Sequence, residues 1–260
     1  MSGSQPSRRG RPRAPFDGRA LARLARRAGA LALRNAPGSE SPLAAAREVE
    51  RAIESWIARE AHASTPRPRV ALAHEAEPLP RSEWVLTLDP VDGLDAYLAG
   101  LPTWSVVVAL LHRGEPWSAA VCAPALRDLY VASSGALRWQ GRVISAGEVS
   151  PGTRGFVLGK GLEKRSILRL RRRREAEGPI SYHACLVARG AAEGAVLGRL
   201  NLREAAPLVA LLEPVGGELL SLRTGRPLRL ESLERGRPSR DPILAAAPGR
   251  GAALVARLKK

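Results

Sequence analysis

Residues 17–68 show the apolar spacing of two amphipathic helices. After Asp17, whose carboxylate can cap a helix, apolar residues recur every three or four positions up to Ala32. Pro37 and Gly38 end this segment, and Ser41–Pro42 starts a second helix with a cap and a first-turn proline. The predicted buried faces are Leu21, Leu24, Ala25, Ala28, Leu31 and Ala32, then Ala46, Val49, Ile53, Trp56 and Ile57.

Short apolar runs rich in branched residues predict strands at 70–73, 85–88, 105–111, 117–121 and 129–132. The short connections between the later runs predict an antiparallel sheet. Beyond a break in character over 147–155, strands alternate with helices, which is typical of an α/β arrangement. The predicted strands there are 155–158, 195–200, 218–222 and 243–246, and the predicted helices are 163–177, 184–190, 204–212 and 251–258.

The pattern divides the chain into three segments. They are a disordered basic tail over 1–16, an α+β half over 17–147 and a smaller α/β half over 148–260. There is no apolar run of membrane-spanning length and no apolar stretch typical of a signal peptide, so a cytoplasmic protein without a membrane partner is expected. Cys122 and Cys185 lack metal-ligand spacing and are interpreted as buried small residues.

The formal net charge of +16 comes almost entirely from arginine. A charge of this size is compatible with nucleic acid or another anionic surface as a partner. Abundant Arg with scarce Lys is also what a GC-rich coding bias produces, and a positive field attracts small phosphorylated substrates too. Any binding of nucleic acid through the basic surface is therefore predicted to be electrostatic and non-specific.

A pair of aspartates follows the predicted strand that ends at Leu88. Asp89–Pro90 is expected to stop the strand, because proline cannot donate to a ladder, and Asp92–Gly93 is expected to form a turn. Two carboxylates three residues apart on a tight loop suit Mg²⁺, which binds a few rigidly held oxygens and keeps several waters. The alternative is that both are simply common turn dipeptides.

The sequence around these aspartates, Asp89-Pro90-Val91-Asp92-Gly93, with Glu75 upstream and Gly100-Leu101-Pro102 downstream, resembles the inositol monophosphatase family. The resemblance continues through 184–190, 204–206 and 212–218, and covers about residues 17–255. It implies the family's layered α-β-α-β-α sandwich and a Mg²⁺-dependent, lithium-sensitive phosphomonoesterase. Family members are often dimers, so a homodimer is an expectation by analogy only.

The resemblance also implies a site. The family holds its first Mg²⁺ with a glutamate, the first loop aspartate and the carbonyl between the aspartates, which correspond to Glu75, Asp89 and Val91. His74 is the alternative at the glutamate position, but oxygen suits Mg²⁺ better than imidazole. Asp92 corresponds to the second loop aspartate, so the implied catalytic set is Glu75, Asp89 and Asp92. The residues expected near the substrate phosphate are Gly93, Leu94, Asp95 and Arg203.

Arg203 is the most consequential departure from the family pattern, because the family has an aspartate of the second metal site there. Two alternatives are open: its guanidinium lies between Asp89 and Asp92 in place of the cation, or it points to solvent. A helix start shifted by one residue, which would present Glu204 instead, is not expected. The other departures are Leu94 for a water-orienting threonine, Ala46 for an aspartate, 180–183 without a substrate-contacting glycine, and Val196 for an inositol-contacting glutamate.

Two functions remain open on these residues. Glu75, Asp89 and Asp92 favour a divergent Mg²⁺-dependent phosphatase that hydrolyses a small phosphorylated metabolite, such as a sugar phosphate or nucleotide, with reduced activity. Leu94 and Arg203 favour a catalytically impaired relative that binds a phosphate ligand, RNA or protein. The basic stretch at 169–174 adds some weight to binding, against the alternative of a solvated surface.

Overall fold

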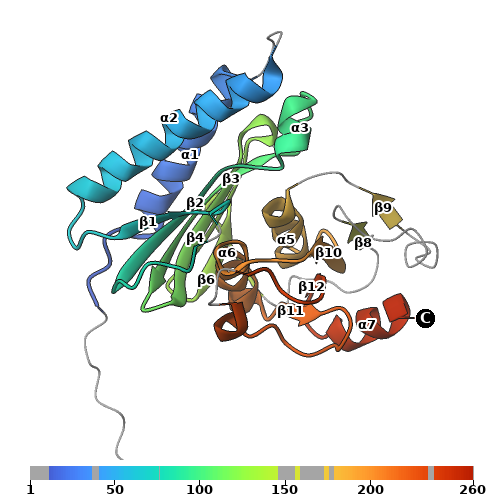
Figure 1. Cartoon of the computed structure of the whole chain (residues 1–260). Coiled ribbons are helices and arrows are strands. Elements are labelled where there is room, and N and C mark those ends of the chain that lie inside the picture. The colour runs from blue at the N-terminus through green and yellow to red at the C-terminus, as the bar shows by residue number, and fades with distance from the viewer. Residues whose placement is uncertain are drawn as a thin grey trace, which may run out of the picture.

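The first half of the chain forms a seven-stranded sheet (Figure 1). The computed structural model describes residues 12–36, 41–75, 77–145, 156–158, 173–175, 179–233 and 237–259. The strands neighbour one another in chain order; β1 and β2 are parallel and every later pair is antiparallel, as predicted. They are β1 (Arg69–Leu72), β2 (Trp84–Asp92), β3 (Ser105–His112), β4 (Glu115–Ala123), β5 (Asp128–Ser133), β6 (Ala136–Trp139) and β7 (Arg142–Ile144).

Helices α1 (Gly18–Arg34) and α2 (Pro42–Ala63) cover one face of this sheet (Figure 1). The predicted start of α1 is confirmed, because the Asp17 carboxylate accepts a hydrogen bond from the Ala20 N–H at 2.7 Å. Phe16 is buried against the core under these helices, so the prediction of a disordered tail is wrong at that end. Residues 1–11 of the predicted tail lie outside the described residues.

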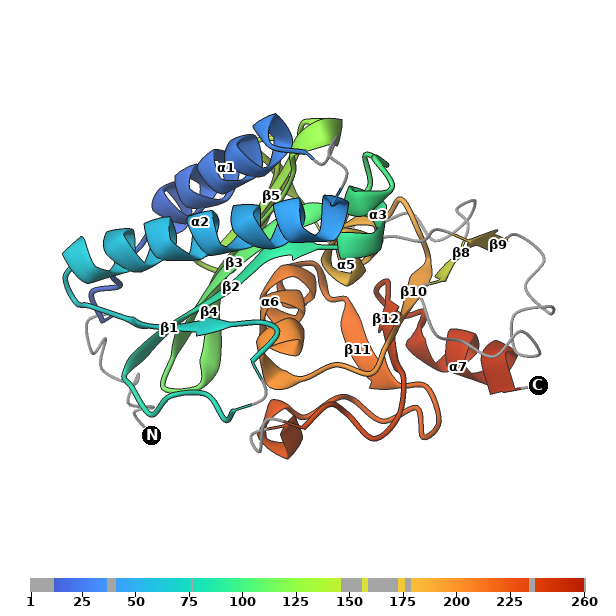
Figure 2. The ribbon, with the colours of Figure 1, turned by 45° about the horizontal axis from the view of Figure 1, so that its top comes forward.

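Helices α5 (Ile180–Ala188) and α6 (Leu202–Leu212) lie between the first sheet and a second one, and α7 (Gly251–Lys259) lies beyond it (Figure 2). The layers therefore follow the expected α-β-α-β-α order. None of the described helices is long and apolar enough to cross a membrane. The second sheet has the order β11-β12-β10-β8-β9, formed by β8 (Phe156–Leu158), β9 (Arg173–Glu175), β10 (Gly194–Gly198), β11 (Glu218–Ser221) and β12 (Ile243–Ala246).

The core is divided into two parts because the central strands are buried on both faces. Along β3, Val106, Val108 and Leu110 pack under α1 and α2, while Val107 and Ala109 face the second half. This explains why the strand is a continuous apolar run rather than an alternating one.

Several predicted elements differ from the structure in the second half. The helix predicted over 163–177 lies mostly outside the described residues, and its part at 173–175 is strand β9 instead. Helix α5 starts at Ile180, four residues before the predicted 184. Strands β6 and β7 were not predicted, because segments of four and three residues are too short to give a periodic signal.

Asp128 ties the first sheet to the second half. Its carboxylate accepts hydrogen bonds from the Trp139 indole N–H at 2.8 Å and from the Tyr182 hydroxyl of α5 at 2.7 Å. The Arg189 guanidinium stacks over the Trp139 ring, 4.5 Å from its centroid. The buried Asp128 carboxylate of β5 thus links this strand to β6 and to α5, the helix that packs beside the aspartate loop.

Tyr182→Phe should lower the free energy of unfolding by about 1.5–3 kcal/mol, because it removes a hydrogen bond to a charged group. Urea unfolding measures this. Tyr130→Phe is the matched control: this hydroxyl is also buried but has no partner among the described residues, so its loss should be neutral or stabilising. Equal costs for both substitutions would contradict the assigned role of Asp128.

Candidate active site

The two aspartates lie at the end of β2, where the strand has a bulge. Asp89 pairs with Val107 of β3, the next pair is Asp92 with Ser105, and the register shifts between them. Pro90 falls inside this bulge, where its missing N–H removes no ladder hydrogen bond. The prediction that Asp89–Pro90 ends the strand is therefore wrong, since β2 continues to Asp92.

Gly93 makes the turn that was predicted after Asp92. Its φ is 93°, and a Cβ there would lie 3.1 Å from the Pro179 backbone nitrogen. The absence of a side chain at Gly93 thus permits both the turn and the close approach of Pro179, the residue before α5, to the loop. Leu94 then packs against the core under α1 and α2, and Asp95 is exposed in the short helix α3 (Leu94–Leu98).

Asp92 is buried and serves as the acceptor at the start of α5. One carboxylate oxygen accepts hydrogen bonds from the Ser181 N–H at 2.9 Å and from the Ser105 hydroxyl at 3.3 Å. Pro179, the residue before the helix, has no side chain that caps it, so Asp92 supplies the negative charge that a helix N-terminus favours. Burial raises the pKa of Asp92, and these hydrogen bonds oppose the shift.

Asp89 has fewer donors. Its carboxylate accepts a hydrogen bond from the Val91 N–H at 3.2 Å. Burial, then the neighbouring charge of Asp92 and then that of Glu204, hold the pKa of Asp89 well above its usual range. An ionised Asp89 is therefore a source of electrostatic strain that a bound cation or a proton would relieve.

Arg203 is 3% exposed and takes neither of the two expected positions. Its guanidinium donates to the backbone carbonyls of Glu75, at 3.0 Å, and of Glu77 and Pro78. It also lies 3.5 Å from a carboxylate oxygen of Glu75. Arg203 thus holds the segment after β1, instead of lying between Asp89 and Asp92 or pointing to solvent.

The Glu75 carboxylate takes part in the same contacts. The oxygen that faces Arg203 also accepts a hydrogen bond from the Leu72 N–H at 3.0 Å. His74, the alternative ligand, is exposed. Among the described residues, no group of three or more His, Cys, Asp or Glu side chains is placed to hold a metal, so the implied set of Glu75, Asp89 and Asp92 is not assembled.

Glu204 is the acid of α6 that faces the aspartate loop, which was not expected. The Asn201 side chain accepts from the Glu204 N–H and the Glu204 carboxylate accepts from the Asn201 N–H, which is a capping box. Burial raises the pKa of Glu204, and the charge of Asp92 adds to this. The spacing Asn-x-x-Glu at 201–204 was the sequence signal that fixes this helix start.

A small cavity of about 10 Å³ lies beside Asp89, which is room for about one water molecule. Ile180, Ser181, Arg203, Glu204 and Pro207 are among the residues that enclose it. Mg²⁺ can bind through one or two carboxylates while keeping several waters. Asp89 is the one implied ligand among the residues that enclose this cavity, so it is the carboxylate around which a hydrated cation would be held.

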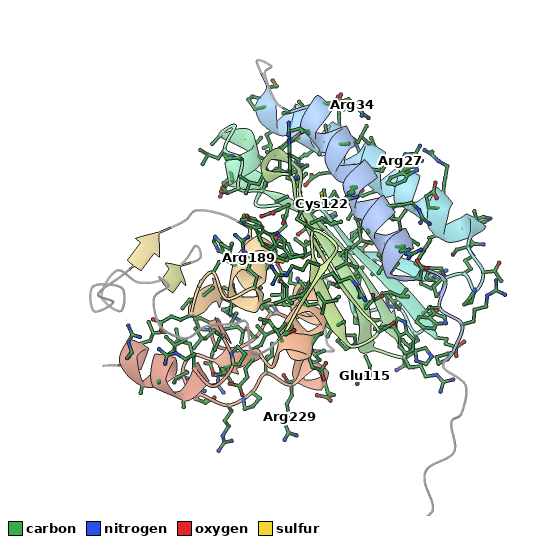
Figure 3. The ribbon with its side chains drawn as sticks, turned by 180° about the vertical axis from the view of Figure 1, so that it is seen from behind. Arg27, Arg34, Glu115, Cys122, Arg189 and Arg229 are labelled. Atoms are coloured by element: carbon green, nitrogen blue, oxygen red, sulfur yellow. The ribbon has the colours of Figure 1, made fainter. Side chains whose placement is uncertain are left out.

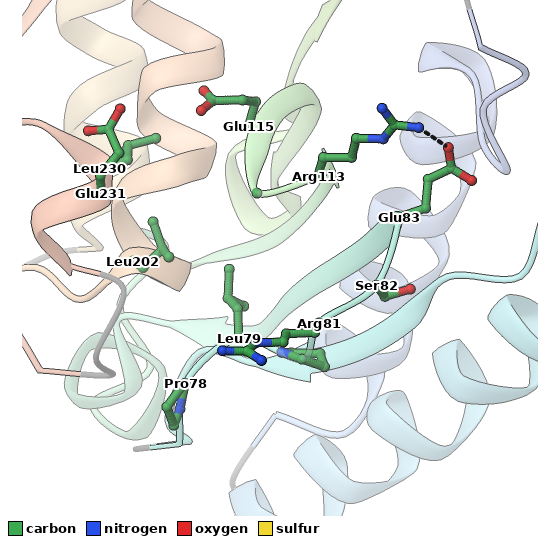
Figure 4. A pocket seen from close by; sticks show the side chains of 12 residues that line it. Pro78, Leu79, Arg81, Ser82, Glu83, Arg113, Glu115, Leu202, Leu230 and Glu231 are labelled. Atoms are coloured by element: carbon green, nitrogen blue, oxygen red, sulfur yellow. Dashed lines mark hydrogen bonds and ion pairs between the residues drawn. The ribbon is translucent and has the colours of Figure 1, made fainter.

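A separate pocket of about 550 Å³ lies on the other side of the segment that Arg203 holds (Figure 4). Leu202 lines this pocket, whereas Arg203 lines the cavity at Asp89. Figure 4 shows Glu115 and Glu231 across the pocket from Arg81, and Arg113 paired with Glu83 at 3.2 Å. Its mixed charges, with two acids facing inward, do not favour a phosphate ligand.

Comparison with known proteins identifies the family to which this chain belongs. The model of the inositol monophosphatase family matches residues 20–258, so the chain belongs to this family. It is 30% identical over 161 residues to the histidinol-phosphatase of Mycobacterium tuberculosis, covering 54% of this chain and 59% of that protein. It is 43% identical over 56 residues to the Nus factor SuhB of Xylella fastidiosa, covering 22% and 20%. The matched part is thus less than two thirds of these relatives' length.

Solved structures agree on the fold over nearly the whole chain. The extragenic suppressor protein suhB from Bartonella henselae superimposes with a TM-score of 0.74 at 19% identity, covering 92% of this chain and 98% of that one. The Thermotoga maritima IMPase gives 0.71 at 19% identity, covering 91% and 94%. At this identity the likeness establishes the α-β-α-β-α architecture.

Asp89→Asn should raise the free energy of unfolding in EDTA at pH 7 by about 1–3 kcal/mol, because it removes a buried, poorly compensated charge. The folded-state pKa of Asp89 is raised, so the gain should be complete above that pKa and should vanish as the pH falls toward 3.8. Urea unfolding at several pH values tests this. Glu48→Gln, an exposed change on α2, is the control and should have no effect.

Arg203→Met keeps the side-chain length but removes the donors to the 75–78 segment. Hydrogen bonds of charged groups contribute about 1.5–3 kcal/mol each, so the expected loss is at least about 3 kcal/mol. Arg59→Met, at an exposed position of α2, should change stability by less than about 0.5 kcal/mol. Similar melting temperatures for the two variants would show that Arg203 does not hold this segment.

Proposed function

We propose that this protein is a phosphomonoesterase with strongly reduced activity, in which Asp89 and Asp92 bind a single Mg²⁺. The observation that carries this proposal is the position of Arg203. Arg203 stands at the start of α6, where the resemblance implies a carboxylate, and its guanidinium lies 3.5 Å from the Glu75 carboxylate. One cation held by two aspartates and a carbonyl is then the most that the loop supports.

The chain's own residues supply only part of the chemistry. Mg²⁺, when bound by Asp89, Asp92 and the Val91 carbonyl, supplies positive charge that polarises a phosphoryl group. Leu94 has no hydroxyl to orient an attacking water. One oxygen of the Glu204 carboxylate is engaged in its capping box. Slow hydrolysis is the expected result.

The substrate class that fits best is a small phosphate monoester without an inositol group. Val196, which stands where inositol-specific members have a glutamate, is 0% exposed and packs in the core between the second sheet and α7. It cannot contact a substrate hydroxyl. The likeness to a histidinol-phosphatase supports a monoester other than inositol phosphate, such as a sugar phosphate or nucleotide.

A second candidate is binding without hydrolysis, and the small cavity beside Asp89 favours it. A phosphate group is several times larger than the one water molecule that this cavity holds. Ile180 and Ser181 help to enclose the cavity, so substrate could reach Asp89 if the start of α5 moved away from Asp92. That movement would break the hydrogen bond between Ser181 and Asp92.

The parent protein should hydrolyse p-nitrophenyl phosphate in millimolar Mg²⁺ with a kcat below the typical enzyme range of ~1–10³ s⁻¹. EDTA or Asp89→Asn should abolish this activity, and Glu48→Gln should not change it. A kcat within the typical range on any small monoester would contradict the reduced-activity proposal. Absence of Mg²⁺- or Mn²⁺-dependent turnover above the Asp89→Asn background would leave binding without hydrolysis as the function.

A further inference from the structure

A groove of about 1080 Å³ runs over the second half of the chain, remote from the aspartate loop. One wall is the segment that follows β11, and the other is the segment that leads into β12. The side chains that line it include five arginines, which are Arg199, Arg226, Arg229, Arg237 and Arg240. We propose that this groove binds the phosphodiester backbone of single-stranded nucleic acid.

The charge of the groove is almost wholly uncompensated. Asp241 is the acid among its lining residues, and its carboxylate already accepts hydrogen bonds from Arg223 and from the Ser221 hydroxyl, both at 2.8 Å. These bonds lower the pKa of Asp241, so it stays ionised and paired. In the part of the chain that the structure describes, no carboxylate pairs with Arg226, Arg229, Arg237 or Arg240.

The backbone that presents these arginines is well ordered by hydrogen bonds. The Ser239 N–H donates to the Leu200 carbonyl at 2.7 Å, and the Ser239 hydroxyl accepts from the Leu200 N–H at 3.1 Å. The Leu222 N–H donates to the Pro242 carbonyl at 2.9 Å, which ties one wall to the other. Arg199 donates to the Ser239 carbonyl. The walls are therefore held in place while the guanidinium groups remain available.

The arginines suit an extended polyanion better than a small metabolite. Arg226, Arg229, Arg237 and Arg240 are all exposed, and Figure 3 shows Arg229 extending away from the ribbon into solvent. A small-molecule site would bring buried polar groups together on one ligand. The planar guanidinium instead matches phosphate oxygens along a strand. Among the described residues that line the groove there is no Phe, Tyr or Trp, so binding through it would rest on charge and would be independent of sequence.

The test is fluorescence anisotropy of the full-length protein with a labelled 12-nucleotide uridine oligomer over a range of salt concentrations. Arg226→Gln/Arg229→Gln and Arg237→Gln/Arg240→Gln should each weaken binding at least tenfold. Each pair should also reduce the slope of log affinity against log salt by about 1.4, because a single strand contributes about 0.7 per phosphate contact. A thymidine deoxyoligomer of equal length should behave in the same way.

The matched control is Arg51→Gln/Arg59→Gln on the exposed face of α2, which has the same change in net charge and should alter affinity less than twofold. Arg226→Lys/Arg229→Lys, which retains the charge, should keep most of the affinity and the salt slope. Circular dichroism and thermal melting establish that each variant is folded. Equal weakening by the control pair, unchanged binding in the groove variants, or no binding by the parent would each overturn the proposal. The readout does not depend on phosphatase activity.

Discussion

The burial of two carboxylates side by side at the end of β2 is the constraint on which the arrangement of the site depends. A buried charge is costly unless donors or an opposite charge compensate it. Asp92 meets this requirement through Ser105 and the first turn of α5, so the same contacts fix where α5 sits on the loop. Asp89 receives a hydrogen bond from the Val91 N–H and is repelled by Asp92 and Glu204. The charge of Asp92 is therefore compensated by hydrogen bonds, whereas the charge of Asp89 is not and favours a nearby positive charge.

Arg203 shows that a nearby guanidinium does not automatically satisfy that demand. Its planar fork offers several donors in fixed directions, and these donate to the backbone carbonyls of Glu75 and Pro78. Once these bonds form, the guanidinium is buried and α6 is joined to the segment after β1. The positive charge of Arg203 thereby serves these structural contacts. The same guanidinium lies 3.5 Å from the Glu75 carboxylate, so one side chain joins α6 to both the backbone and a side chain of that segment.

The sequence predicted those elements whose signals are local. The Asp17 cap, the first-turn proline of α2 and the apolar run of β3 were predicted correctly, because capping, proline geometry and burial act over a few residues. The Ser41 side chain makes no capping hydrogen bond, so the cap predicted there is not formed. The continuation of β2 past Pro90 was not predicted, because the bulge that accommodates this proline arises from the pairing with β3 and not from the local sequence. The partners of Arg203 lie 125–128 residues away in the chain, so no local pattern could indicate them. Glu204 was predictable from its capping box.

The aspartate loop and the arginine groove depend on different parts of the fold, which lets one change without the other. A fold fixes backbone positions, whereas chemistry resides in side chains placed on them. Arg203 belongs to a buried network that connects both halves of the chain. The groove arginines instead extend from hydrogen-bonded walls and are exposed, so folding does not require them. Like charges gathered around one groove repel one another and oppose the compact state. An anionic strand bound in the groove, as proposed above, would reduce that repulsion and stabilise the folded protein.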